Sequence, residues 1–154
     1  MSLVGCDRLT HMTQRDVLLE RLDVLIGTWA TEATHPLVDE IVRGEVTFEW
    51  LEGRRFLIQR SRNYHELFPD AISVVGASAD SDGLVMEYFD SRGVRRTYEG
   101  SLEGNLLRFC GEFPEFAQRF SAALESDRFE NRSQLARTPG EWEDDLIATY
   151  RRRA

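Results

Sequence analysis

The spacing of apolar residues predicts one helix near the N-terminus. The stripe consists of Val17, Leu18, Leu22, Leu25 and Ile26, which recur at three- and four-residue intervals. Before it, Thr13-Gln14-Arg15-Asp16 has the spacing of a capping box, with a short acidic residue in the reciprocal place. Gly27 follows the last apolar residue, as glycine commonly does past a helix end. A helix of this length is long enough to cover one end of a barrel.

From Trp29 onward the apolar period changes to two, which is typical of strands. Gly44–Leu51 alternates apolar and polar side chains, Glu52-Gly53 forms a tight turn, and Arg54–Arg62 returns with the same alternation, so this pair predicts a hairpin. Turn signals then arrive every 8–12 residues, roughly the spacing found in all-β domains. The other predicted strands are Trp29–Thr34, Ala71–Ser78, Leu84–Phe89, Val94–Ser101, Leu106–Cys110, Phe116–Leu124, Phe129–Arg137 and Trp142–Arg151.

About ten strands in sequential hairpins bury an apolar face most simply by closing on themselves, and closure removes exposed strand edges. The sequence therefore predicts the all-β class, with a single antiparallel up-and-down β-barrel of about ten strands and an N-terminal helix. A two-sheet sandwich satisfies the same alternation and stays an alternative. We expect residues 13–154 to form this one domain and residues 1–12 to be a flexible leader.

Composition narrows the classes of partner. The chain has 154 residues and a formal net charge of −8, which argues against a nucleic-acid partner because that affinity comes from cationic surface. No apolar run approaches the roughly 20 residues of a membrane span. Two cysteines, Cys6 and Cys110, predict free thiols and a cytoplasmic location rather than a disulfide framework or a metal site. A small-molecule ligand is the remaining expected partner, and a homodimer is left open.

The segment Gly27-Thr28-Trp29, after a helix and at the start of the first strand, resembles the Gly-x-Trp signature of lipocalins and their calycin relatives. In that family the tryptophan packs across the closed end of the barrel against an arginine near the end of the last strand. The resemblance implies that Arg151 takes this place. A guanidinium stacked on an indole is worth ~0.5–2 kcal/mol. Trp29 is therefore expected to be structural.

Further stretches resemble small bacterial calycin-like proteins that are distantly similar to nitrobindin haem barrels. They are Thr34-His35-Pro36, the run from Phe48 to Leu57, the run from Tyr88 to Val94, and Trp142-Glu143-Asp144-Asp145. The resemblance implies a ten-stranded barrel with a ligand cavity and brings no particular activity. A nitrobindin-type barrel uses a histidine in its C-terminal part as iron ligand, whereas His11, His35 and His65 all lie in the first half here. Haem would then need His35, His65, Cys110 or a tyrosine.

Strand parity predicts which polar side chains line the interior. If Phe56 and Ile58 point inward, Arg60 follows them, and the same parity groups Arg96 with Tyr98. The predicted ligand-binding residues are Arg60, Arg96, Tyr98, Gln118, Asp144 and His35, with His35 at the cavity mouth. Apolar walls with a few polar groups are typical of small-ligand sites, and an interior arginine suits an anionic group. In the alternative interpretation a single bulge reverses a face, and these residues form surface ion pairs.

The leading hypothesis is a protein that binds a small, largely apolar ligand, with or without an anionic group, inside the barrel. An isomerase- or hydrolase-type enzyme in the same cavity is the second, with His35, Tyr98 or Asp144 transferring protons. The third is a haem-binding barrel. No catalytic or metal-binding motif in the sequence chooses among them, so whether the protein is an enzyme and which cofactor it uses stay open.

Overall fold

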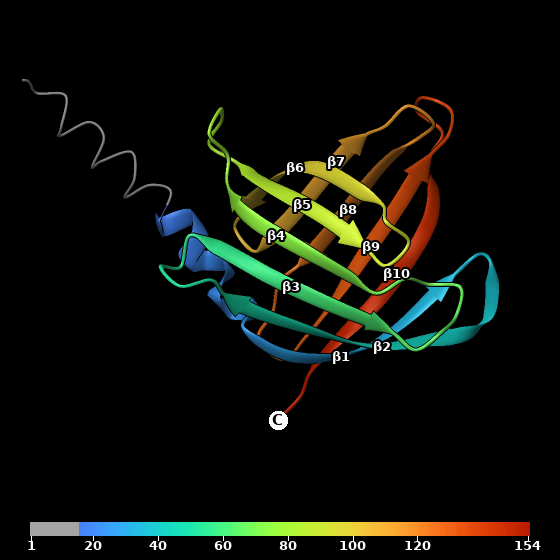
Figure 1. The fold of residues 1–154 in the computed structure, drawn as a ribbon, viewed down its shortest axis with the longest axis horizontal. Helices are drawn as coiled ribbons and strands as arrows, with labels where there is room; N and C mark the ends of the chain where they lie inside the picture. The colour runs from blue at the N-terminus through green and yellow to red at the C-terminus, as the bar shows by residue number, and fades with distance from the viewer. Residues whose placement is uncertain (1–15) are drawn as a thin grey trace, which may run out of the picture.

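Ten antiparallel strands close into one barrel in the computed structural model, which describes residues 16–154 (Figure 1). Each strand pairs with its neighbours in sequence, and β1 pairs with β10 to complete the ring. The strands are β1 Gly27–His35, β2 Val38–Trp50, β3 Phe56–Asn63, β4 Ala71–Ala77, β5 Leu84–Asp90, β6 Arg95–Glu103, β7 Leu106–Glu112, β8 Ala117–Ala123, β9 Arg128–Ala136 and β10 Glu143–Arg152. The predicted up-and-down barrel is confirmed, and the sandwich is not formed.

The N-terminal helix covers one end of this barrel. Residues 16–20 are α-helical, and the chain then tightens into the 3-10 helix η1, Arg21–Leu25. Leu22 and Leu25 of the predicted stripe are buried in the barrel core together with Leu19, whereas Val17 is exposed. Gly27 ends the helical part with φ +127°, a backbone conformation that favours glycine. The leader and residues 13–15 of the predicted capping box lie outside the described residues.

Trp29 seals the same end. Its side chain is fully buried, its indole Nε1–H donates to the Leu25 carbonyl at 2.8 Å, and its ring meets Phe129 edge-on at 4.9 Å between centroids. Tyr150 stacks on Phe129 at 4.6 Å. The structural role expected for Trp29 thus matches its place in the fold.

The arginine on Trp29 is Arg152, which corrects the expected Arg151. Trp29 lies directly opposite Arg152 in the β1–β10 register, so the two side chains share a face, whereas Arg151 is exposed on the outer face. The Arg152 guanidinium lies 4.3 Å from the indole centroid and donates to the carbonyl of Ile26 at 2.6 Å. It also donates to the carbonyls of Val24 and Ser126. Arg152 therefore ties the helix to the last strand.

Strand β3 presents the opposite face from the one expected. Leu57 is buried at 1% exposure, whereas Phe56 is 46% exposed and lies on the outer face. Gly76, opposite Phe56 in β4, lacks the side chain that would occupy the position of the Phe56 ring, so the ring packs there outside the barrel. Arg60 consequently points outward and pairs with Glu49 at 3.2 Å. The apolar pair Phe56 and Ile58 therefore lies on the outer face of β3.

A register shift in β10 between Asp144 and Ile147 reverses the face of the predicted Asp144. Asp144 is exposed outside the barrel and accepts from Arg132 and Gln134, each at 3.3 Å. The next residue, Asp145, turns into the lumen instead. A bulge puts an extra residue in one strand and so changes the alternation beyond it.

Alternate connections of an up-and-down barrel lie at opposite ends. The helix and Trp29 close the end at which β1 begins, and we call the other end, at which β1 finishes with His35, the open end. The β1–β2, β3–β4, β5–β6, β7–β8 and β9–β10 connections all lie there. Figure 1 shows the β1–β2 hairpin projecting at the side away from the N-terminal helix.

Candidate functional site

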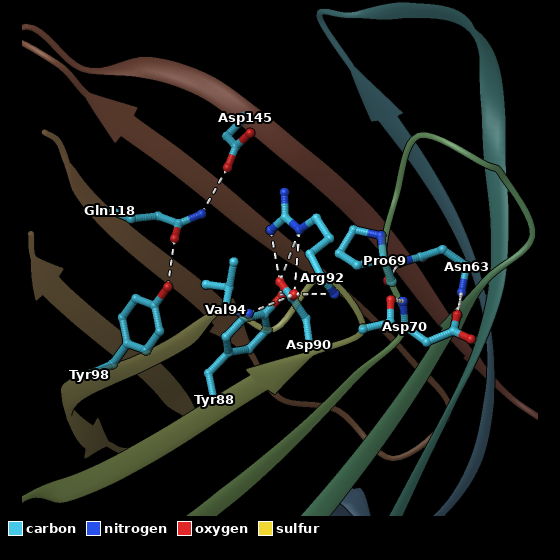
Figure 2. A network of polar contacts seen from close by, with 11 residues as sticks. Asn63, Pro69, Asp70, Tyr88, Asp90, Arg92, Val94, Tyr98, Gln118 and Asp145 are labelled. Atoms are coloured by element: carbon cyan, nitrogen blue, oxygen red, sulfur yellow. Dashed lines mark hydrogen bonds and ion pairs between the residues drawn. The ribbon is translucent and has the colours of Figure 1, made fainter.

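A chain of hydrogen bonds crosses the lumen near the open end (Figure 2). The Tyr98 hydroxyl donates to Gln118 Oε1 at 2.7 Å, and Gln118 Nε2 donates to Asp145 Oδ2 at 2.9 Å. Ser133 Oγ donates to the same carboxylate oxygen at 3.2 Å, and His35 Nε2 lies 2.7 Å from the other. Strands β6, β8, β9, β10 and β1 each supply one member of this chain. Three predicted site residues, Tyr98, Gln118 and His35, therefore meet.

The hydrogen bonds of His35 fix its tautomer. Its Nδ1 accepts from the backbone N–H of Leu37 at 3.0 Å, so the neutral ring carries its proton on Nε2 and donates to Asp145. Both ring nitrogens are then engaged within the protein. A general base needs a free nitrogen within reach of substrate, and this arrangement offers none.

Burial raises the pKa of Tyr98, against a smaller opposing effect from the nearby Arg96. Its side chain is only 1% exposed, and desolvation disfavours the phenolate. Tyr98 is therefore a neutral donor whose proton is directed at Gln118. The polar groups along this chain of hydrogen bonds are partners of one another, which is the usual condition for polar groups in an apolar interior.

Arg96 lies beside this chain in a cage of aromatic rings. Its guanidinium carbon is 4.9 Å from the ring centroid of Phe116, 5.6 Å from Phe113 and 6.0 Å from Tyr88. The side chain is half-buried, and within residues 16–154 it forms no ion pair with a carboxylate. A cation in an apolar setting without a counter-charge is costly unless something pairs with it. The positive charge of Arg96 thus has no carboxylate partner among residues 16–154.

The turn before β6 is built around a buried carboxylate (Figure 2). The Asp90 side chain is 0% exposed and accepts from Tyr88 Oη at 2.7 Å and Arg92 Nη2 at 2.7 Å. Burial opposes ionisation of Asp90, but the hydrogen bonds from Arg92 and Tyr88 outweigh it and hold its pKa at about 2. Burial, and then the bond to Asp90, raise the pKa of Tyr88. This network fixes the start of β6 and so the place of Arg96.

A second histidine repeats the geometry of the first. His65 Nε2 lies 2.6 Å from Glu40 Oε1, and its Nδ1 accepts from the Leu67 backbone N–H at 3.1 Å. Phe68 lies between the two imidazoles, edge-on to His35 at 5.1 Å and to His65 at 5.3 Å. The hydrogen bond from His65 lowers the pKa of Glu40. The open end thus carries a His–Phe–His cluster.

Sequence reasoning missed several members of the open end. Asp145 and Ser133 are absent from the predicted set, and the bulge that turns Asp145 inward has no clear signature in the sequence. The sequence predicts His65 only as an alternative haem ligand. A usable signal was present in the spacing His35-Pro36-Leu37 and His65-Glu66-Leu67, which gives both histidines the same turn. Of the predicted set, Arg60 and Asp144 lie outside the barrel, away from the other four.

The described histidines do not fit a haem ligand. Both ring nitrogens of His35 and of His65 are engaged in hydrogen bonds, so neither has a lone pair free for iron. Cys110 is exposed on the outer face of β7. Across residues 16–154, no group of three or more His, Cys, Asp or Glu side chains is placed to hold a metal ion.

The outer surface has its own features. A hollow of about 400 Å³ lies over β8 and β9, and its lining includes Ser121, Ala123, Arg128 and Arg132. These residues point away from the lumen, so the hollow is separate from the open end. Within the described part of the chain, none of the helices is both long and apolar enough to span a membrane.

Comparison with known proteins bears on the fold. No protein-family model matches the chain, and no curated protein does. The crystal structure of Rv2717c from M. tuberculosis is similar with a TM-score of 0.65 and 19% identity, covering 89% of this chain and 98% of that one. An S-type phycobiliprotein lyase from Guillardia theta is similar with a TM-score of 0.58 and 10% identity, covering 88% and 92%. Likenesses at these identities concern the fold alone, which is the closed antiparallel β-barrel described above.

Proposed function

We infer that this protein binds a small, largely apolar ligand carrying an anionic group, at the open end of its barrel. The observation that carries the proposal is Arg96, a half-buried guanidinium caged by three aromatic rings with no carboxylate partner among the described residues. A carboxylate or sulfonate on the ligand supplies the missing charge, and guanidinium groups bind such anions through charge-assisted hydrogen bonds.

The surroundings of Arg96 suit an apolar body rather than a polar one. Tyr98 meets the rings of Phe113 and Phe120 edge-on, at 5.5 Å and 5.1 Å, so aromatic side chains form this wall of the lumen. The hydrogen-bond donors of Tyr98 and Gln118 are already directed within the chain that ends at His35. A ligand with many hydroxyl groups would find few open partners there, whereas one with a single anionic group needs only Arg96.

The proposal gives each residue a role. Arg96 anchors the anionic group, and Tyr98, Gln118 and His35 shape the polar side of the site. The exposed, unpaired thiol of Cys110 suits a reducing compartment, and a cytoplasmic location is part of the proposal on that ground.

A matched pair of fluorescent probes tests the proposal. 8-Anilinonaphthalene-1-sulfonate carries one negative charge, and N-phenyl-1-naphthylamine has nearly the same apolar body without it. We expect Arg96→Gln to weaken binding of the sulfonate about tenfold, or ~1.4 kcal/mol, because a charge-assisted contact is lost. Binding of the neutral probe is expected to change less than about twofold, because this probe makes no ionic contact with Arg96 that the substitution could remove.

Arg95→Gln is the control, because Arg95 is the exposed neighbour of Arg96 on the other face of β6. It removes the same charge from the chain and leaves the lumen intact. Equal losses of sulfonate binding in the two variants would show a general charge effect and contradict the proposal. Failure of the unmodified protein to bind either probe would contradict it as well.

A further inference from the structure

The β3–β4 connection, residues 64–70, is clamped at its two ends. At the first end the backbone N–H of Tyr64 donates to the Arg43 carbonyl at 2.8 Å. At the second, Asn63 Nδ2 donates to the Pro69 carbonyl at 2.9 Å and the Asp70 carboxylate accepts from the Asn63 backbone N–H at 3.1 Å (Figure 2). The Asp70 carbonyl also accepts from the Ser91 backbone N–H at 2.8 Å. The ends of this segment are therefore fixed to β2, β3 and the β5–β6 turn.

The middle of the segment, residues 65–68, is held mainly by itself. The Leu67 N–H donates to His65 Nδ1, and the Phe68 N–H donates to the His65 carbonyl at 3.1 Å. Both bonds stay inside the segment and give it one rigid shape. Leu67 is 60% exposed, so its side chain faces solvent. Residues 65–68 thus form a preformed unit between two anchored ends of the segment.

Few contacts join this unit to the barrel. Within residues 16–154, its polar link to another element is the pair His65–Glu40, and Glu40 is 62% exposed. Its other attachment is Phe68, which reaches back, packs against the core residues and meets the His35 ring at 5.1 Å. A single hydrogen bond to so exposed a carboxylate contributes little stability. The unit is thus attached to the barrel by one exposed hydrogen bond and one inserted ring.

We propose that residues 64–70 form a lid on the open end, with Phe68 as its plug and the His65–Glu40 pair as its latch. Phe68 fills the space between the two imidazoles while the lid is closed. A ligand reaches Arg96 after residues 65–68 move outward, while Asn63 and Asp70 keep the ends of the segment in place. The lid rests on the proposed function for its purpose. Whether the lid opens is measured by how fast a reagent enters the barrel interior, which needs no ligand.

Access is measured by the alkylation of a thiol placed inside the lumen. Ser133 is 3% exposed, and Ser133→Cys is a nearly isosteric change. Cys6→Ser and Cys110→Ser make it the sole thiol, and N-ethylmaleimide is a small neutral reagent. We expect Phe68→Ala to raise the labelling rate about tenfold, because it removes an aromatic contact from the closed state. Glu40→Ala is expected to raise it about threefold, because the exposed contact that it removes is weaker.

Leu67→Ala is the matched control, since Leu67 lies in the same segment with its side chain in solvent, and we expect its labelling rate to stay within twofold of the parent. The unfolding midpoint of every variant is measured in urea, so that labelling through global unfolding is recognised. Glu40→Ala keeps the experiment decisive if Phe68→Ala does not fold. An unchanged rate in Glu40→Ala and Phe68→Ala, or an equal acceleration in Leu67→Ala, would overturn the lid.

Stopped-flow binding of anilinonaphthalene sulfonate separates this proposal from the function. A lid predicts that Glu40→Ala speeds association and dissociation by the same factor and leaves the Kd unchanged. If the sulfonate fails to bind but labelling follows the expected order, the proposed function falls and the lid stands. If the sulfonate binds through Arg96 but labelling ignores Phe68 and Glu40, the lid falls and the function stands.

Discussion

At the scale of single residues, Arg152 combines two contacts that its neighbour Arg151 lacks. Its guanidinium lies over the Trp29 ring and donates to three carbonyls at the joint between helix and barrel. Those carbonyls belong to the end of the helical segment and to the β8–β9 connection, where backbone acceptors need partners from elsewhere. One side chain therefore joins three parts of the chain that are distant in sequence.

Arg152→Ala is expected to lower the free energy of unfolding by roughly 2–3 kcal/mol, the sum of a cation–π contact and unsatisfied carbonyls. Arg151→Ala is expected to change it by less than about 0.5 kcal/mol, as exposed substitutions usually do. Urea unfolding of both variants measures the difference. Similar losses of unfolding free energy in the two variants would show that the closed end depends on the positive charge of the C-terminal arginines and not on the stacking of Arg152 on Trp29.

The candidate site shows which residues parity predicts well. Arg96, Tyr98 and Gln118 lie in strands without a register shift before them, so counting by twos places them correctly. The prediction that Arg60 points inward is wrong because β3 has apolar residues on both faces, with Leu57 inside and Phe56 outside. In a strand of that kind hydrophobicity alone does not say which face is the core.

At the scale of elements, the bulge in β10 decides which carboxylate belongs to the site. It exchanges Asp144 for Asp145, and with that exchange the Gln118 chain gains its acceptor. A bulge depends on the pairing with β9 and is not written in the local sequence of β10. The turn from β5 to β6 is different, because Asp90-Ser91-Arg92-Gly93 has the residues of a tight turn, and Gly93 has φ +85°.

Asp90 makes the stability of that turn depend on pH. Its folded pKa of about 2 lies below the ordinary 3.8, so its contribution to stability is present above about pH 4 and is lost as the pH falls toward 2. We expect Asp90→Asn to lower the free energy of unfolding by roughly 1–2 kcal/mol at pH 7 and by almost nothing at pH 2. Urea titrations at several pH values measure this.

Asp82→Asn is the control for that experiment, because Asp82 is exposed in the turn between β4 and β5. Its effect is expected to be small and constant with pH. A loss in Asp90→Asn that stays the same from pH 7 to pH 2 would mean that the Asp90 carboxylate is not held ionised by Arg92 and Tyr88.

At the scale of the whole molecule, the barrel has two different ends. One is sealed by the helix, Trp29 and Arg152, and the other carries Arg96, the chain from Tyr98 to His35, and the segment that holds Phe68. The ring of strands was predictable because periodicity and turn spacing are local signals. The side chains at the open end were less predictable, because they come from five strands and the β3–β4 connection.

The most direct test of the central claim is a two-dimensional NMR titration of the labelled protein with anilinonaphthalene sulfonate. The account predicts saturable one-to-one shifts at the Arg96 Nε–H and the Gln118 side-chain amide, with the Trp29 indole N–H unmoved. Shifts centred instead on the outer hollow, at Ser121, Ala123 and Arg128, with Arg96 and Gln118 unmoved, would contradict a binding site at the open end.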